Sequence, residues 1–142
     1  MSEDLELLNF VYQNAKMGTS SIDHLLPAIQ DKKFESLVLE QRKDYEKICK
    51  RVEKYLKKEK KKPEDLDLMA KVNSYIAVKM DTARDDHISH LAEMLIKGSN
   101  MGIIQIKKHM NQYSRVEKEV MAIANELLER EEKNLEELKP YL

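Results

Sequence analysis

The chain has 142 residues, with 25 Lys and Arg against 26 Asp and Glu, so its net charge at pH 7 is -1. A charge so close to zero produces no overall field that would attract nucleic acid or an anionic membrane surface. The single cysteine, Cys49, excludes a disulfide within the chain and suits a reducing compartment.

Length and the amino-terminal sequence indicate one cytoplasmic domain over residues 1–142. The opening residues Met1-Ser2-Glu3-Asp4 are acidic and lack the apolar stretch of a secretory signal. No run of residues approaches the roughly 18 apolar residues that span a bilayer. We therefore expect a protein that does not associate with membranes.

Two amphipathic helices are predicted first, over residues 3–29 and 32–60, and they make up a first hairpin over about residues 3–60. In each helix, apolar side chains recur every three or four positions and so fall on one face. The stripes run through Leu8, Val11, Ala15, Gly18, Ile22 and Leu25, and through Phe34, Val38, Gln41, Tyr45, Ile48 and Val52. The short link at residues 30–31 predicts that the two helices run antiparallel.

A crossover helix and a second hairpin follow. Pro63 suits the first position of a helix, which we predict over about residues 63–84. Two further amphipathic stretches, over residues 86–111 and 114–139, predict a second hairpin over about residues 86–139. Periodicity leaves open whether the crossover and residues 86–111 form one continuous helix. The expected fold is all-α, with two helical hairpins joined by a helical crossover.

The second hairpin looks like a repeat of the first. Residues 16–22 align with residues 100–106, and residues 37–48 align with residues 127–138. The first alignment places the dipeptide Met17-Gly18 on Met101-Gly102, on the apolar stripe of each helix. We interpret this match as an internal duplication.

Two glycines inside the predicted helices call for an explanation, because Gly in a helix costs about 1 kcal/mol relative to Ala. Gly18 and Gly102 lie at matched positions on the apolar stripes. We expect a neighbouring backbone or a bulky side chain to come close to both. The alternative for Gly102 is that the stretch Gly98-Ser99-Asn100 simply interrupts the helix just before it.

The order of hairpin, crossover and hairpin, together with the paired Met-Gly dipeptides, resembles the ferritin-like and rubrerythrin-like helical bundle superfamily. The similarity is greatest to its small, uncharacterised bacterial members with a degenerate metal site. This resemblance implies an antiparallel ferritin-like four-helix bundle across nearly the whole chain. In metal-loaded members, two helices each supply a Glu and two each supply Glu-x-x-His, all directed into the bundle.

Six polar residues stand at or near the corresponding positions of this chain. They are Gln41, Asp44, Glu131 and Asn134 on the second helix of each hairpin, and Asn14 and Asn100 on the first helices. Bridging carboxylates and imidazoles hold iron or manganese in such sites, but no His stands here. We therefore predict a non-catalytic bundle without a cofactor, in which these side chains hydrogen-bond one another. Such a protein would work by binding an unidentified protein partner or by forming a homo-oligomer.

Alternatives remain open for these core residues. Glu131, Asp44 and Gln41 could still hold Fe, Mn or Zn, either as a metal-binding protein or as a redox enzyme. Gln41, Asp44, Glu131 and Asn134 could also form a site for an unidentified ligand. A separate, weaker metal candidate is Asp86 with His87 and His90, because two His three residues apart on a helix can share a zinc ion with a carboxylate.

A lysine-rich segment over residues 54–62 is the remaining candidate for binding. Clustered lysines can contact phosphates. A single aromatic residue, Tyr55, lies among them, and no nucleic-acid motif accompanies them. A solvated helix end, where cations suit the negative end of the helix dipole, explains them better, so nucleic-acid binding is not expected.

Overall fold

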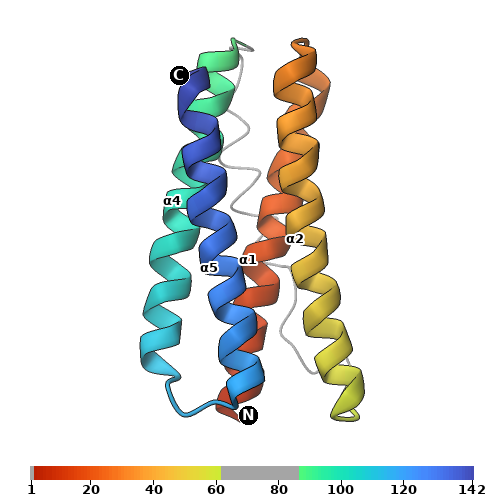
Figure 1. Ribbon diagram of the computed structural model, residues 1–142, viewed down its shortest axis with the longest axis vertical. Coiled ribbons are helices and arrows are strands. Elements are labelled where there is room, and N and C mark those ends of the chain that lie inside the picture. The colour runs from red at the N-terminus through yellow and green to blue at the C-terminus, as the bar shows by residue number, and fades with distance from the viewer. Residues whose placement is uncertain (1, 62–86) are drawn as a thin grey trace.

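The computed structural model describes residues 2–61 and 87–142, and the regular structure of these residues is helical. Four long helices lie side by side (Figure 1): α1 (Glu3–Leu25), α2 (Lys32–Lys58), α4 (Ile88–Gln112) and α5 (Lys118–Leu138). Short 3-10 turns follow α1 and α5, η1 (Leu26–Ala28) and η3 (Lys139–Tyr141). The all-α prediction is confirmed. The crossover helix predicted over residues 63–84 lies outside the described residues.

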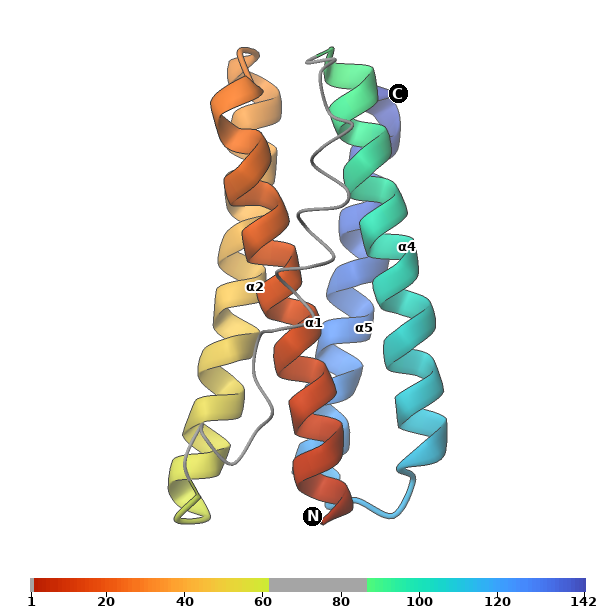
Figure 2. The ribbon, with the colours of Figure 1, turned by 180° about the vertical axis from the view of Figure 1, so that it is seen from behind.

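The helices are arranged as two pairs that face each other. The closest packing joins α1 to α2 and α4 to α5, and further contacts join α1 to α4 and to α5, and α2 to α5. In Figure 1, α1 rises from the N-terminus and α2 descends, whereas α4 descends and α5 rises to the C-terminus. Figure 2 shows α1 beside α4 from behind. The helices of each pair therefore run in opposite directions, as do α1 and α4 and α2 and α5, whereas α1 and α5 run in the same direction.

Local sequence explains where the helices begin. The Asp31 carboxylate accepts a hydrogen bond from the backbone N–H of Phe34, at 2.8 Å, and so caps the start of α2. Ser2 caps α1 in the same way through Leu5 N, at 3.3 Å. The backbone of His87 is extended, with φ -61° and ψ 138°, and α4 begins directly after it. The α4 segment thus starts as a helix of its own.

The helix ends depart slightly from the sequence prediction. The first helix was expected to reach residue 29, but α1 ends at Leu25 and continues as the 3-10 turn that contains Pro27. Proline lacks the backbone N–H that a further α-turn requires. At the other end of the hairpin, α2 ends at Lys58, and Lys60 adopts a left-handed conformation with φ 57°.

The predicted apolar stripes form a continuous aliphatic core between the four helices. Its fully buried side chains include Leu7, Leu8, Phe34, Ile48, Ile106, Ile123 and Leu127. Burying one such side chain contributes about 1.5–3 kcal/mol. None of the described helices is long and apolar enough to cross a membrane.

Tyrosines connect helices through hydrogen bonds at the edges of this core. The Tyr12 hydroxyl of α1 donates to Glu53 of α2, at 3.1 Å. The Tyr113 hydroxyl, at the end of α4, donates to Glu6 of α1, at 2.6 Å. These bonds fix the helices to one another on both sides of α1. A different set of polar residues lies in the middle of the bundle.

Candidate functional site

Polar side chains gather inside the bundle at mid-height, where an apolar core would be expected. The residues are Gln41 and Tyr45 on α2, Ser99 on α4, and Glu131 and Asn134 on α5. Gln41 and Glu131 are each 2% exposed, and Asn134 is completely buried. They occupy positions three or four residues apart on the inward stripes, so the same periodicity that buries leucine elsewhere buries them.

Glu131 is the acid of this cluster. Its Oε1 accepts a hydrogen bond from the Tyr45 hydroxyl. Within residues 2–61 and 87–142, no hydrogen bond reaches Oε2 and no Lys, Arg or His pairs with the carboxylate. Burial raises the pKa of Glu131 to about 8, although the bond from Tyr45 acts in the opposite direction. The carboxyl is therefore mostly neutral at pH 7.

Tyr45 stays protonated throughout the ordinary pH range. Its burial, followed by the charge of the neighbouring Glu131, raises its pKa well above the usual value. Ser99 and the amide of Asn134 lie near the phenol and partly offset this rise. Because it keeps its proton, Tyr45 acts as a hydrogen-bond donor and not as a base.

Asn14 and Gly102 lie near the other oxygen of Glu131. Asn14 Nδ2 donates to the backbone oxygen of Gly102, at 3.0 Å, which fixes the orientation of the amide. A Cβ added to Gly102 would overlap Glu131 Oε2 and would lie 3.0 Å from Asn14 Oδ1. The amide oxygen of Asn14 and Oε2 of Glu131 thus both lie close to the position that a Cβ of residue 102 would occupy. A neutral carboxyl suits this place, because it can donate its proton toward an oxygen that would repel a carboxylate.

Gly18 makes room for Tyr45 in the first hairpin. A Cβ added to Gly18 would lie 2.6–2.7 Å from three atoms of the Tyr45 ring, closer than real Cβ atoms approach. Around Gly98, by contrast, no atom lies within 4 Å of an added Cβ. The predicted close approach at Gly18 and Gly102 is confirmed. The alternative that Gly98-Ser99-Asn100 interrupts the helix is wrong, because α4 runs through these residues.

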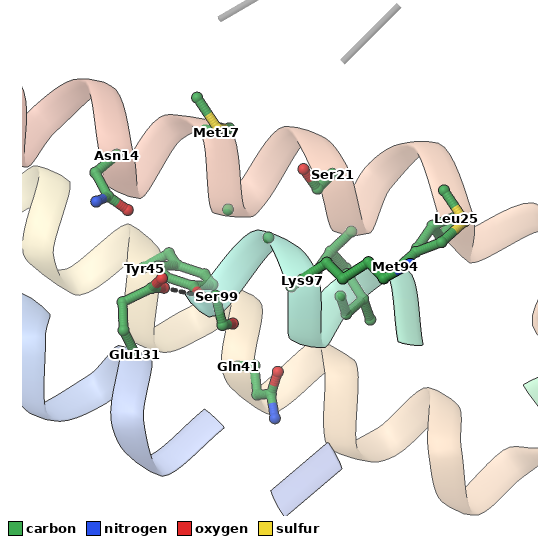
Figure 3. A pocket seen from close by; sticks show the side chains of 14 residues that line it. Asn14, Met17, Ser21, Leu25, Gln41, Tyr45, Met94, Lys97, Ser99 and Glu131 are labelled. Carbon is green, nitrogen blue, oxygen red and sulfur yellow. Dashed lines mark hydrogen bonds between the residues drawn. The ribbon is translucent and has the colours of Figure 1, made fainter. Parts of the chain in front are cut away.

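Gln41 links the two facing helices α2 and α5. Its Nε2 donates to the backbone oxygen of Asn134, at 3.2 Å. Figure 3 shows its side-chain oxygen turned the other way, toward the cavity. Within the described residues no hydrogen bond reaches this oxygen. The side-chain amide of Asn134 also lacks a partner within hydrogen-bonding geometry among these residues.

A cavity of about 80 Å³ opens between α1 and α4 over this polar cluster. One part of its lining is apolar and includes Met17, Ile22, Leu25, Met94 and Leu95. The other part is polar and includes Asn14, Gln41, Tyr45, Ser99 and Glu131. Figure 3 shows the polar side chains reaching the cavity from all four helices. Other lining residues are partly exposed, among them Ser21 on α1 and Met94 on α4.

The structure brings four of the six predicted core residues together and leaves two outside. Gln41, Glu131, Asn134 and Asn14 belong to the cluster, and all but Asn134 line the cavity. The expectation for the other two needs correction, because Asp44 is only half-buried and Asn100 is exposed. Each residue turns about 100° further around a helix. The inward positions therefore fall one residue away, at Tyr45 and Ser99, and the stripe containing Tyr45 already signalled the first of them.

The weaker candidates for metal and phosphate binding do not form a site within the described residues. Asp86 lies outside the described residues, while His87 caps α4 on the surface and His90 is half-buried. Among the described residues, no three His, Cys, Asp or Glu side chains come close enough to hold a metal ion. The described lysines of the segment 54–62 are exposed or half-buried at the end of α2, and Lys58 pairs with Glu119, at 2.5 Å.

No family model, curated protein or solved structure matches this chain. The functional argument is therefore built on the core cavity and its polar lining.

Proposed function

We propose that this protein is a non-catalytic helical bundle that works by binding, and that a small ligand enters the cavity between α1 and α4. The observation that carries the proposal is the divided lining of this cavity. Met17, Leu25 and Met94 give the cavity an apolar side. Gln41 and Glu131 give it polar groups that are themselves buried. Small-molecule sites combine a mostly apolar surface with a few oriented polar groups.

The chemistry of the lining favours binding over catalysis. The titratable residues that line the cavity are Tyr45, Lys97 and Glu131. Tyr45 keeps its proton, and Glu131, with a pKa of about 8, is mostly protonated at pH 7, so the cavity holds no fully ionised base at that pH. Lys97 pairs with Glu93 at the surface, at 3.2 Å. Cys49 lies outside the cavity, and burial raises the pKa of its thiol to about 11, which leaves it unreactive.

A ferritin-like arrangement is part of this proposal. It is supported by two facing helix pairs, each of which is antiparallel, and by close approaches at both Gly18 and Gly102. In this view, Gln41 and Glu131 occupy the places of former metal ligands. The internal duplication, a homo-oligomer, a protein partner and a cytoplasmic location stay predictions from the sequence.

The metal-binding alternative fits the cluster less well. Fe, Mn and Zn sites in such bundles need several carboxylates or imidazoles around each ion. Of the three residues that we considered, Glu131 and Gln41 line the cavity but Asp44 does not. Elemental analysis of the purified protein and of Glu131→Ala would test this alternative. Loss of bound metal in the variant alone would favour it over an organic ligand.

The binding proposal is tested with a set of three- to five-carbon alcohols, amines and amides added to the protein. Amide NMR signals of Gly18, Ser21 and Ser99 should shift together on binding. Ser21→Leu fills the outer part of the cavity and should abolish these shifts, whereas Ser20→Leu, at a neighbouring residue outside the lining, should not. If no compound moves these signals, or if Ser21→Leu leaves them unchanged, the cavity is not a binding site.

A further inference from the structure

Resting on the proposed function, we propose that the ligand is a short primary alkylammonium ion, whose head group binds to Glu131 and Gln41 while its alkyl chain lies against Met17, Leu25 and Met94. The cavity would thus bind a cation that carries an apolar tail. Three features of the site support this assignment: the kind of polar atoms it presents, its balance of charge, and its size.

The polar atoms beside Glu131 that a ligand can reach include several hydrogen-bond acceptors. Gln41 uses its N–H on the backbone of Asn134, so its oxygen remains for the cavity, as Figure 3 shows. Asn14 uses its N–H on Gly102, which leaves its oxygen beside Glu131 Oε2. An ammonium group carries three donors and no acceptor. It therefore matches the oxygens of Glu131, Gln41 and Asn14, which would repel a carboxylate ligand placed among them.

The charge balance of the site favours a cation. Glu131 is 2% exposed and no basic side chain among the described residues pairs with it. Lys97 lines the cavity, but its ammonium pairs with Glu93 on the surface. A charged donor forms stronger hydrogen bonds with a carboxylate than a neutral one does. A bound ammonium ion would supply the missing counter-charge and stabilise the ionised form of Glu131.

The size of the cavity limits the alkyl chain. Its volume is about 80 Å³, roughly half that of the cavity of about 150 Å³ that holds benzene in another protein. A three- or four-carbon chain fits such a space. The methionines at its border, Met17 and Met94, are flexible side chains that can adjust to chains of slightly different length. n-Propylammonium is therefore the probe of choice.

Binding of a cation beside Glu131 makes affinity depend on pH. The groups that face Glu131 are Tyr45 from α2, Asn14 from α1, and Gly102 and Ser99 from α4, with Lys97 at the border of the cavity. Of these, Tyr45 keeps its proton and Asn14 does not titrate. With a Glu131 pKa of about 8, the ionised fraction rises from about one tenth at pH 7 to about nine tenths at pH 9. Because alkylammonium ions, like Lys, keep their proton to about pH 10, affinity should rise about tenfold over this range.

The test is an NMR titration with n-propylammonium chloride at constant ionic strength, with n-propanol and propionate as comparison ligands. Propylammonium should bind at least about ten times more tightly than propanol, and propionate should not bind. Glu131→Gln keeps the shape of the neutral carboxyl but removes the charge, so it should lose the tenfold gain between pH 7 and pH 9. Glu126→Gln removes a carboxylate that pairs with Arg51 at the surface and should behave as the wild type.

The outcomes separate this inference from the proposed function. If propanol binds as tightly as propylammonium and Glu131→Gln changes neither, the cavity binds a neutral ligand and the cation assignment is wrong. If Glu131→Gln and the wild type bind propylammonium equally at both pH values, the cation lies elsewhere on the protein and the assignment is also wrong. If no probe moves the signals of Gly18, Ser21 and Ser99, both the inference and the proposed function fail.

Discussion

At the scale of single residues, Glu131 gives this fold a pH dependence opposite to that of a salt-bridged acid. Its pKa is about 8 in the folded chain and 4.5 when unperturbed. A raised pKa means that the folded state binds the proton more tightly than the unfolded state. The stabilisation is therefore fully present below pH 4.5, and it is lost as the pH rises toward 8, by up to about 1.4 kcal/mol per pH unit.

Glu131→Gln should remove this pH dependence. The amide can still accept from Tyr45 and can donate toward Asn14 Oδ1, so it imitates the neutral carboxyl. We expect the free energy of unfolding of the wild type to fall by up to about 4 kcal/mol between pH 5 and pH 8, whereas that of the variant stays nearly level. Urea denaturation across this range measures both. Parallel profiles for the two proteins would show that Glu131 is ionised or hydrated in the native state.

Gly102 and Gly98 lie in the same helix but should respond in opposite ways to alanine. At Gly102 the new Cβ overlaps Glu131 Oε2, so Gly102→Ala should destabilise the protein by about 1–3 kcal/mol. At Gly98 it meets nothing within 4 Å, so Gly98→Ala should stabilise by up to about 1 kcal/mol. Thermal denaturation distinguishes these signs.

A double variant checks the cause at Gly102. If the clash with Glu131 is responsible, Glu131→Ala should cost less in the Gly102→Ala background than in the wild type. Strictly additive effects of the two substitutions would show that Gly102 is needed for another reason, such as the backbone hydrogen bond from Asn14.

At the scale of elements, the start of α2 depends on one side chain. Asp31 caps the first turn through Phe34 N, directly after the short turn that joins α1 to α2. Asp31→Ala should lower the free energy of unfolding by about 1 kcal/mol, because it leaves a helix N–H without its partner. Asp31→Asn retains an acceptor at the same place and should cost much less. Equal losses in the two variants, measured by urea denaturation, would assign the effect to charge and not to capping.

Helix geometry also explains why some sequence predictions were accurate and others were displaced by one residue. Helix interiors were predicted well, because a helix that packs on one face repeats its apolar positions every three or four residues. Asp44 and Asn100 were misplaced by a single residue, since the border of a stripe does not reveal on which side the neighbouring helix lies. The apolar stripe already placed Tyr45 inward, whereas the packing of α4 against α1 decides that Ser99, and not Asn100, faces the cavity.

At the scale of the whole molecule, Cys49 reports on opening of the bundle. The residue is 4% exposed, and burial raises the pKa of its thiol to about 11. A thiol reagent should therefore modify it only after the chain opens. For a domain of ordinary stability, about 5 kcal/mol or more, labelling should be at least about 1,000 times slower than in the urea-unfolded chain. Rapid labelling of the native protein would mean that α2 separates locally from its neighbours.

The sequence alone determined the helical class, the approximate helix boundaries, the burial of Gln41 and Glu131, and the close approaches at Gly18 and Gly102. These properties follow from periodicity along one chain and from the energetic cost of glycine in a helix. The tertiary structure decided the rest: which polar residues meet, how much space remains between them, and that Glu131 holds its proton at neutral pH. A cavity is a difference between volumes contributed by four helices, and a raised pKa results from the loss of water around a carboxyl that several helices enclose. Neither property belongs to any one segment of the sequence.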